Sequence, residues 1–74
     1  MAFFTVTESI NSHPIYSCPE YTAALHWISL RYDPDQILTH VIEIQELDPE
    51  TLKPIGTTPS VDLYYQLITE GYYL

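Results

Sequence analysis

The chain is poor in positive charge, in cysteine and in glycine, and each shortage argues against a class of protein. Two basic residues stand against ten acidic ones, giving a formal net charge of −8. Such a surface repels phosphate backbones and anionic membranes, so we expect no direct binding to nucleic acid or to a membrane. A single cysteine cannot form a disulfide within the chain and suits a reducing, cytoplasmic compartment. Two glycines form no glycine-rich phosphate-binding loop.

The chain also lacks a long apolar run. No stretch approaches the roughly 20 apolar residues that span a bilayer, and residues 1–7 lack the positive flank of a signal peptide. The hydrophobic fraction is nevertheless 46%, which is sufficient for a core in spite of the acidity. The length of 74 residues predicts one compact domain over residues 1–74.

The first half of the sequence predicts a β-hairpin followed by a helix. Aromatic and β-branched residues at 3–8 favour a strand, residues 9–14 have turn chemistry, and residues 15–17 return as a second strand. The segment Cys18-Pro19-Glu20 favours a helix start with Ser17 or Cys18 as its cap, and Asp33-Pro34-Asp35 ends the helix. The apolar stripe of this helix contains Tyr21, Ala24, Leu25, Ile28 and Tyr32.

The second half predicts two further strands and a C-terminal helix. Residues 37–47 have the pattern of a strand, 48–51 form a turn, and 52–55 form an irregular edge strand. Residues 61–68 fit a helix that Ser60 caps and Gly71 ends, although the same run also alternates tolerably as a strand. We favour the helix. The predicted fold is α+β, of ββαββα type, with one or two helices packed on one face of an antiparallel sheet.

Residues for catalysis or metal binding are few. Cys18 with His13 or His26 would be a nucleophile and its base, but a thiol near a helix start has a sufficient structural explanation, and the start lowers its pKa only modestly. Together with His40 these residues make four potential zinc ligands, which is the number a zinc site needs, but their spacings match no zinc motif. We expect no catalytic residue, metal or cofactor. A metal- or thiol-dependent enzyme or sensor is the remote alternative.

Acidic residues form the first candidate partner-binding surface. The residues are Asp33, Asp35, Glu43, Glu46, Asp48 and Glu50. They are either a solvated strand face and turn or a docking face for a protein rich in lysine and arginine. Carboxylates on one face of a strand repeat at about 6.7 Å, against about 3.4 Å per phosphate of one DNA strand. Mimicry of nucleic acid therefore needs a second acidic row, from Asp33 and Asp35 or from Glu8.

Tyrosines form the second candidate surface. The chain has seven, of which Tyr64, Tyr65, Tyr72 and Tyr73 lie near the C-terminus. Tyrosine offers large contact area at low entropic cost and is enriched in interfaces. Residues 71–74 are apolar, so they either pack on the sheet of their own chain or dock onto a partner or a second copy.

In size, charge and architecture the chain resembles small phage-encoded inhibitors of host enzymes or defence complexes, including anti-CRISPR proteins. No motif is shared, so no residue role is carried over. The resemblance implies steric or phosphate-mimicking blockade of a basic channel in the host cytoplasm. We predict a non-enzymatic inhibitor or adaptor that docks on a basic surface of a larger protein or ribonucleoprotein. The alternative is a small structural subunit or homodimer that uses the tyrosine-rich C-terminal face.

Overall fold

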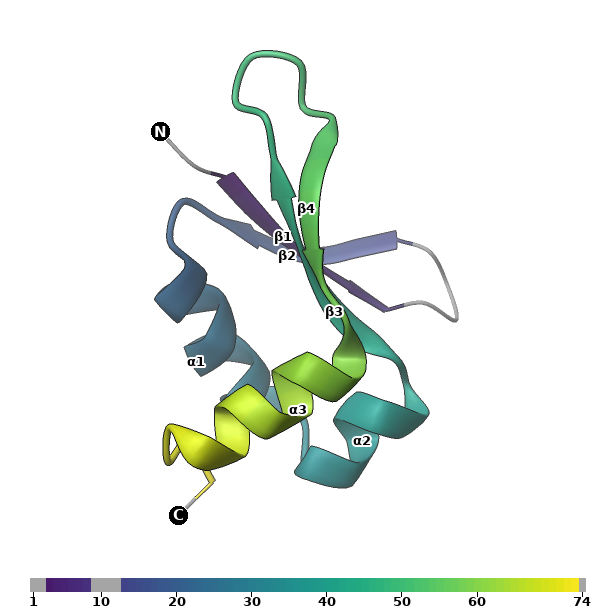
Figure 1. The fold of residues 1–74 in the computed structure, drawn as a ribbon, viewed down its shortest axis with the longest axis vertical. Helices are drawn as coiled ribbons and strands as arrows, with labels where there is room; N and C mark the ends of the chain where they lie inside the picture. Colours follow the sequence, from purple (N-terminus) through teal and green to yellow (C-terminus); the bar gives the residue numbers. More distant parts are fainter. Residues whose placement is uncertain (1–2, 9–12, 74) are drawn as a thin grey trace.

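The computed structural model describes residues 3–8 and 13–73, which form a four-stranded antiparallel sheet with three helices against it (Figure 1). The fold is α+β, as predicted. The elements in chain order are β1 (Phe3–Glu8), β2 (His13–Cys18), α1 (Tyr21–Arg31), α2 (Pro34–Thr39), β3 (Ile42–Leu47), β4 (Pro54–Thr58) and α3 (Ser60–Thr69).

The strand order is β2-β1-β3-β4, so β1 and β3 are central and β2 and β4 are edges. Val6 lies opposite Tyr16 of β2 and opposite Ile44 of β3. The pairing of β1 with β2 shifts register after Val6, because Thr7 pairs with Pro14 and leaves Ile15 without an opposite residue. The shift is a β-bulge, which bends an edge strand locally.

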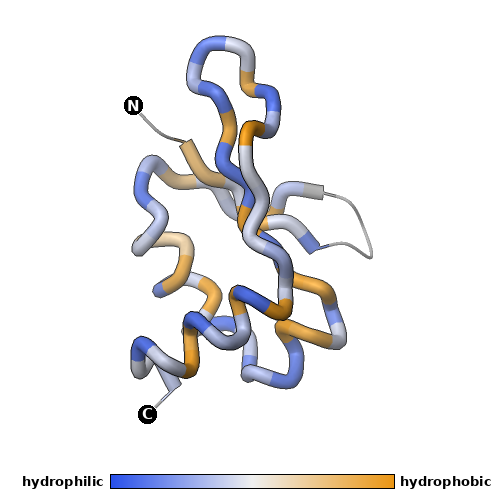
Figure 2. The backbone as a smooth tube through the Cα atoms, viewed as in Figure 1, coloured by the Kyte–Doolittle hydropathy of each residue, from blue (hydrophilic) through white to orange (hydrophobic). Residues whose placement is uncertain are grey.

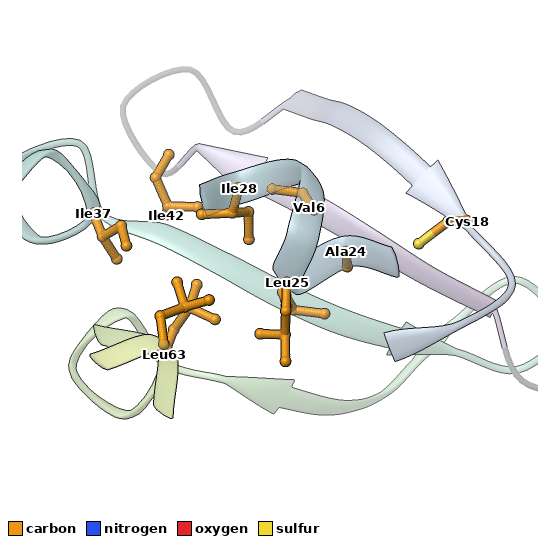
Figure 3. Packing of buried hydrophobic residues seen from close by; sticks show 10 residues of the cluster. Val6, Cys18, Ala24, Leu25, Ile28, Ile37, Ile42 and Leu63 are labelled. Carbon is orange, nitrogen blue, oxygen red and sulfur yellow. The ribbon is translucent and has the colours of Figure 1, made fainter. Parts of the chain in front are cut away.

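One hydrophobic cluster joins the helices to one face of the sheet (Figure 3). Alternation along β1 and β3 directs Val6, Ile42 and Ile44 toward the helices, where they are at most 1% exposed. All three helices contribute to the same cluster. The helical members are Ala24, Leu25, Ile28, Ile37, Leu63 and Leu67. Cys18 lies at its margin, 4% exposed.

The prediction of a single strand over residues 37–47 is wrong for its first part, because residues 34–39 form helix α2. Pro34 ends α1, as expected, but proline also suits the first position of a new helix. Gln36 strengthens the helix start, since its side-chain Oε1 accepts a hydrogen bond from the Asp33 N–H at 2.8 Å. Ile37 then enters the core. Val41 follows α2 with a positive φ of 53° and turns the chain into β3.

Several predicted boundaries also differ. The N-cap of α1 is Glu20, so neither Ser17 nor Cys18 caps this helix. The predicted strands at 15–17 and 52–55 are β2 and β4, and β4 begins only at Pro54. The predicted turn at 48–51 is confirmed and closes the β3–β4 hairpin, whose tip projects beyond the helices (Figure 1). Part of the predicted turn at 9–14 lies outside the described residues.

The C-terminal run 61–68 is helical, as favoured. Helix α3 ends in a Schellman motif, in which Gly71 has φ 81° and donates its N–H to the Ile68 carbonyl. The N–H of Tyr72 donates to the Leu67 carbonyl at 3.0 Å. Ser60 starts the helix, but the N-cap position belongs to Pro59 and no side chain caps it. None of the helices in the described part of the chain is both long and apolar enough to cross a membrane.

Candidate protein-binding surface

The structure separates the six acidic residues predicted to form one surface. Glu46, Asp48 and Glu50 belong to the β3–β4 hairpin, whereas Asp33 and Asp35 belong to the start of α2, at the opposite end of the molecule (Figure 1). Glu43 alternates with Ile42 and Ile44 and so lies on the face of β3 that the helices leave uncovered. The helix start therefore supplies no second acidic row beside the hairpin.

We call residues 46–56 the acidic arm. Asp48 shapes its turn, because its Oδ1 accepts hydrogen bonds from the N–H of Glu50 at 2.8 Å and of Thr51 at 3.3 Å. Leu52 has φ 60° and donates its N–H to the Asp48 carbonyl at 2.7 Å. Leu52 and Ile55 are 63% and 61% exposed. The arm therefore presents carboxylates and apolar side chains together, and Figure 2 shows this mixture of hydrophilic and hydrophobic residues.

A groove of about 430 Å³ lies at the base of the acidic arm. Phe4, Glu46 and Gly56 stand directly opposite one another on three neighbouring strands and share the helix-facing side of the sheet. Tyr21 of α1 forms another part of the wall, and its ring meets that of Phe4 edge-on at 5.5 Å. The remaining lining residues are Ile44, Thr57 and Thr58.

Hydrogen bonds hold the Tyr21 ring in place. Its hydroxyl donates to Gln66 Oε1 of α3 at 2.7 Å and lies 3.2 Å from Thr58 Oγ1 of β4. One side chain thus links α1, α3 and the edge strand. The Tyr21 side of the groove is consequently held by three elements of the fold.

The carboxylates of the described residues have few ionic partners. Glu8 lies 3.6 Å from His40 Nδ1; apart from Glu8, no carboxylate of the described residues is ion-paired. Arg31 instead lies over the Trp27 ring, 5.0 Å from its centroid, and Trp27 stacks on Tyr16 at 4.7 Å. Among the described residues, ion pairs therefore leave most of the negative charge uncompensated.

The predicted tyrosine-rich surface is also divided. Tyr72 and Tyr73 are half-buried and pack against the hydrophobic cluster of their own chain. The Tyr73 hydroxyl donates to the Tyr32 carbonyl at 2.7 Å, and burial together with nearby Asp33 raises the pKa of Tyr73. Tyr64 is half-buried, and Tyr65 is 62% exposed.

Helix α3 has an apolar stripe that faces outward, and the sequence pattern did not show that this stripe is exposed. Val61, Tyr64, Tyr65 and Ile68 share one face of this helix, and the core-facing residues on the other are Leu63 and Leu67. Val61 and Ile68 are 54% and 43% exposed. The spacing of Leu63 and Leu67 by four residues was the available signal for the buried face.

Cys18 is poorly placed for chemistry. Its thiol donates to the Glu20 carbonyl at 3.1 Å, and burial raises its pKa, contrary to the prediction that a helix start would lower it. His26 is exposed on α1, and His40 lies at the end of α2 beside Glu8. The side chain of His13 lies outside the described residues. In the part of the chain that the structure describes, no group of three or more potential ligands is arranged to hold a metal ion.

Comparison with protein-family models, with curated proteins and with solved structures finds no match to this chain.

Proposed function

We propose that the chain is a non-catalytic binding protein, an inhibitor or adaptor, that docks on a basic surface of a larger protein or ribonucleoprotein. The observation that carries the proposal is the unpaired state of the carboxylates other than Glu8 among the described residues. Carboxylates without internal partners are available to cationic groups of another molecule. Complementary charge accelerates encounter and rejects acidic partners.

The acidic arm is the part of the surface best suited to the contact. It projects beyond the helices, so a partner reaches it without collision with the rest of the fold (Figure 1). Exposed Leu52 and Ile55 lie on the same arm as its carboxylates. An interface needs apolar area as well as complementary charge, because exposed ion pairs alone contribute about 0–1 kcal/mol each.

Affinity capture tests the proposal. Immobilised protein is expected to retain basic proteins or ribonucleoproteins from the native cell and to release them between about 50 and 500 mM NaCl, because salt screens exposed charges. The double variant Glu46→Gln/Glu50→Gln should retain at least about tenfold less. Asp48 is left unchanged because it shapes the turn.

The matched control is Asp35→Asn/Glu43→Gln, which removes the same charge away from the arm. It should retain most of the partner. Retention that salt and both double variants leave unchanged would contradict the proposal, as would the absence of any basic protein among those captured.

Assembly through the C-terminal face is the second proposal. The exposed stripe of Val61, Tyr65 and Ile68 supports it. Two observations weaken this second proposal. Tyr72 and Tyr73 pack within their own chain, and two copies with a net charge of −8 repel one another.

A further inference from the structure

We infer that the groove at the base of the acidic arm receives one arginine side chain of the partner. The inference rests on the proposed function and adds to it a defined pocket and a defined ligand group. The groove combines an aromatic wall, a single carboxylate and an opening beside a glycine.

Two neighbouring rings form the aromatic wall of the groove. Phe4 belongs to β1 and Tyr21 to α1, with ring centroids 5.5 Å apart and an interplanar angle of 66°. The hydrogen bond from Tyr21 to Gln66 fixes the second ring. Aromatic faces attract cations, and the planar guanidinium of arginine also stacks on them.

The carboxylate comes from Glu46, the neighbour of Phe4 across β1 and β3. Glu46 continues the row of Ile42 and Ile44 and is half-buried where that row leaves the core. No cation of the described residues pairs with it. A carboxylate accepts two parallel hydrogen bonds from a guanidinium, and such bonds are stronger than neutral ones.

Gly56 leaves the side of the groove beside β4 open. It stands opposite Glu46, and apart from Gly56 and its two chain neighbours no residue has an atom within 4 Å of the position that a Cβ would take there. Any larger residue at position 56 would extend into the space next to the carboxylate. The lack of a side chain at this position of the edge strand leaves the groove wider beside Glu46.

Arginine fits this combination better than other side chains. Its methylene stem suits the apolar part of the groove lining, and its head suits the rings and Glu46 together. Lysine offers a compact, strongly hydrated charge without a planar face. Neutral and acidic side chains leave the Glu46 carboxylate uncompensated.

A capped peptide, acetyl-Gly-Arg-Gly-amide, provides the direct probe, with binding followed by amide chemical shifts of the full chain. Shift changes are expected at Glu46, Gly56 and Thr58. The same peptide with citrulline, the uncharged isostere of arginine, should bind at least about tenfold more weakly. The lysine peptide should fall between the two.

Two variants locate the site. Glu46→Gln removes the charge and Gly56→Val narrows the groove beside it, and each should weaken binding of the arginine peptide at least about tenfold. The control Glu43→Gln removes one charge from the other face of β3 and should leave binding within about twofold. Amide spectra of the free variants verify that each retains the fold.

A hexa-arginine peptide separates failure of the groove from failure of the proposed function. Salt-sensitive binding of hexa-arginine that Glu46→Gln and Gly56→Val do not weaken overturns the arginine pocket and leaves the proposed function standing. Equal binding of arginine and citrulline peptides also overturns it. No binding of either arginine peptide at about 20 mM salt overturns both.

Discussion

At the scale of single residues, one phenol hydroxyl attaches the C-terminal segment to the rest of the molecule. The Tyr73 hydroxyl donates to the Tyr32 carbonyl, which follows the last residue of α1. The Tyr73→Phe variant should be less stable by about 1 kcal/mol, the usual net value of one hydrogen bond. Urea unfolding at pH 7 measures the loss.

The same substitution has a predictable pH dependence. Burial and Asp33 raise the pKa of Tyr73 in the folded state above its ordinary value of 10.0. The stabilisation by the neutral phenol is therefore complete below pH 10 and is lost as the pH rises through the raised folded pKa. The stability difference between Tyr73→Phe and the parent protein should shrink above about pH 10.

Tyr65→Phe is the matched control for Tyr73→Phe. Tyr65 is 62% exposed, and its hydroxyl has no hydrogen bond to the rest of the described chain. Loss of the Tyr65 hydroxyl should leave the free energy of unfolding unchanged both at pH 7 and above about pH 10. If the stability difference between Tyr73→Phe and the parent protein stayed constant from pH 7 to about pH 11, the neutral Tyr73 hydroxyl would not be the source of that difference.

At the scale of elements, the end of α3 depends on a glycine. Gly71 has φ 81°, a conformation that strains any residue with a Cβ, and its N–H closes the Schellman motif. Gly71→Ala should therefore lower the free energy of unfolding by about 1 kcal/mol. Thermal unfolding should show a decrease of about 4–8 °C in Tm.

The second glycine of the chain is the control for Gly71→Ala. Gly56 lies in β4 with open space around it, so Gly56→Ala should change stability by less than about 0.5 kcal/mol. Gly71→Asn should be tolerated better than Gly71→Ala, because asparagine adopts the left-handed conformation more readily. Equal losses for Gly56→Ala and Gly71→Ala would show that the motif has no special requirement.

Elements defined by local chemistry could be predicted from the sequence. The first hairpin strand, the body of α1, the turn after Asp48 and the end of α3 at Gly71 follow from residue types at fixed spacing. Helix α2 was missed because Pro34 ends one helix and also begins the next. Six residues are too few for periodicity to distinguish a helix from the adjoining strand.

The groove could not be predicted, because it depends on strand order and register. Phe4 and Glu46 are distant in sequence and become neighbours only when β3 pairs with β1. Sequence spacing also grouped Asp33 and Asp35 with the residues of the acidic arm, although the intervening helix α2 carries them away. Acidic residue types indicated a surface chemistry, and the fold decided which of them meet.

At the scale of the whole molecule, unpaired negative charge opposes the compact state. Self-repulsion among carboxylates without partners weakens as salt shortens the Debye length from about 30 Å at 0.01 M to about 10 Å at 0.1 M. Between these NaCl concentrations the free energy of unfolding by urea should therefore rise.

A variant with fewer negative charges tests whether repulsion between carboxylates causes this salt dependence. Glu50 and Glu70 are both exposed, and Glu50→Lys/Glu70→Lys changes the net charge from −8 to −4. Its stability should depend less on NaCl than that of the parent protein. Equal salt dependence of the two would assign the effect to something other than repulsion between carboxylates.

The central position of β1 has a consequence for biosynthesis. A ribosome completes β1 and β2 well before β3, so the nascent chain forms its first hairpin while the other edge of β1 is unpaired. Helices α1 and α2 emerge during that interval, and α1 shields the face that carries Val6. The backbone edge of β1 stays open until residue 47 leaves the exit tunnel, and open edges template aggregation. During synthesis the edge of β1 that pairs with β3 therefore stays unpaired for longer than the edge that pairs with β2.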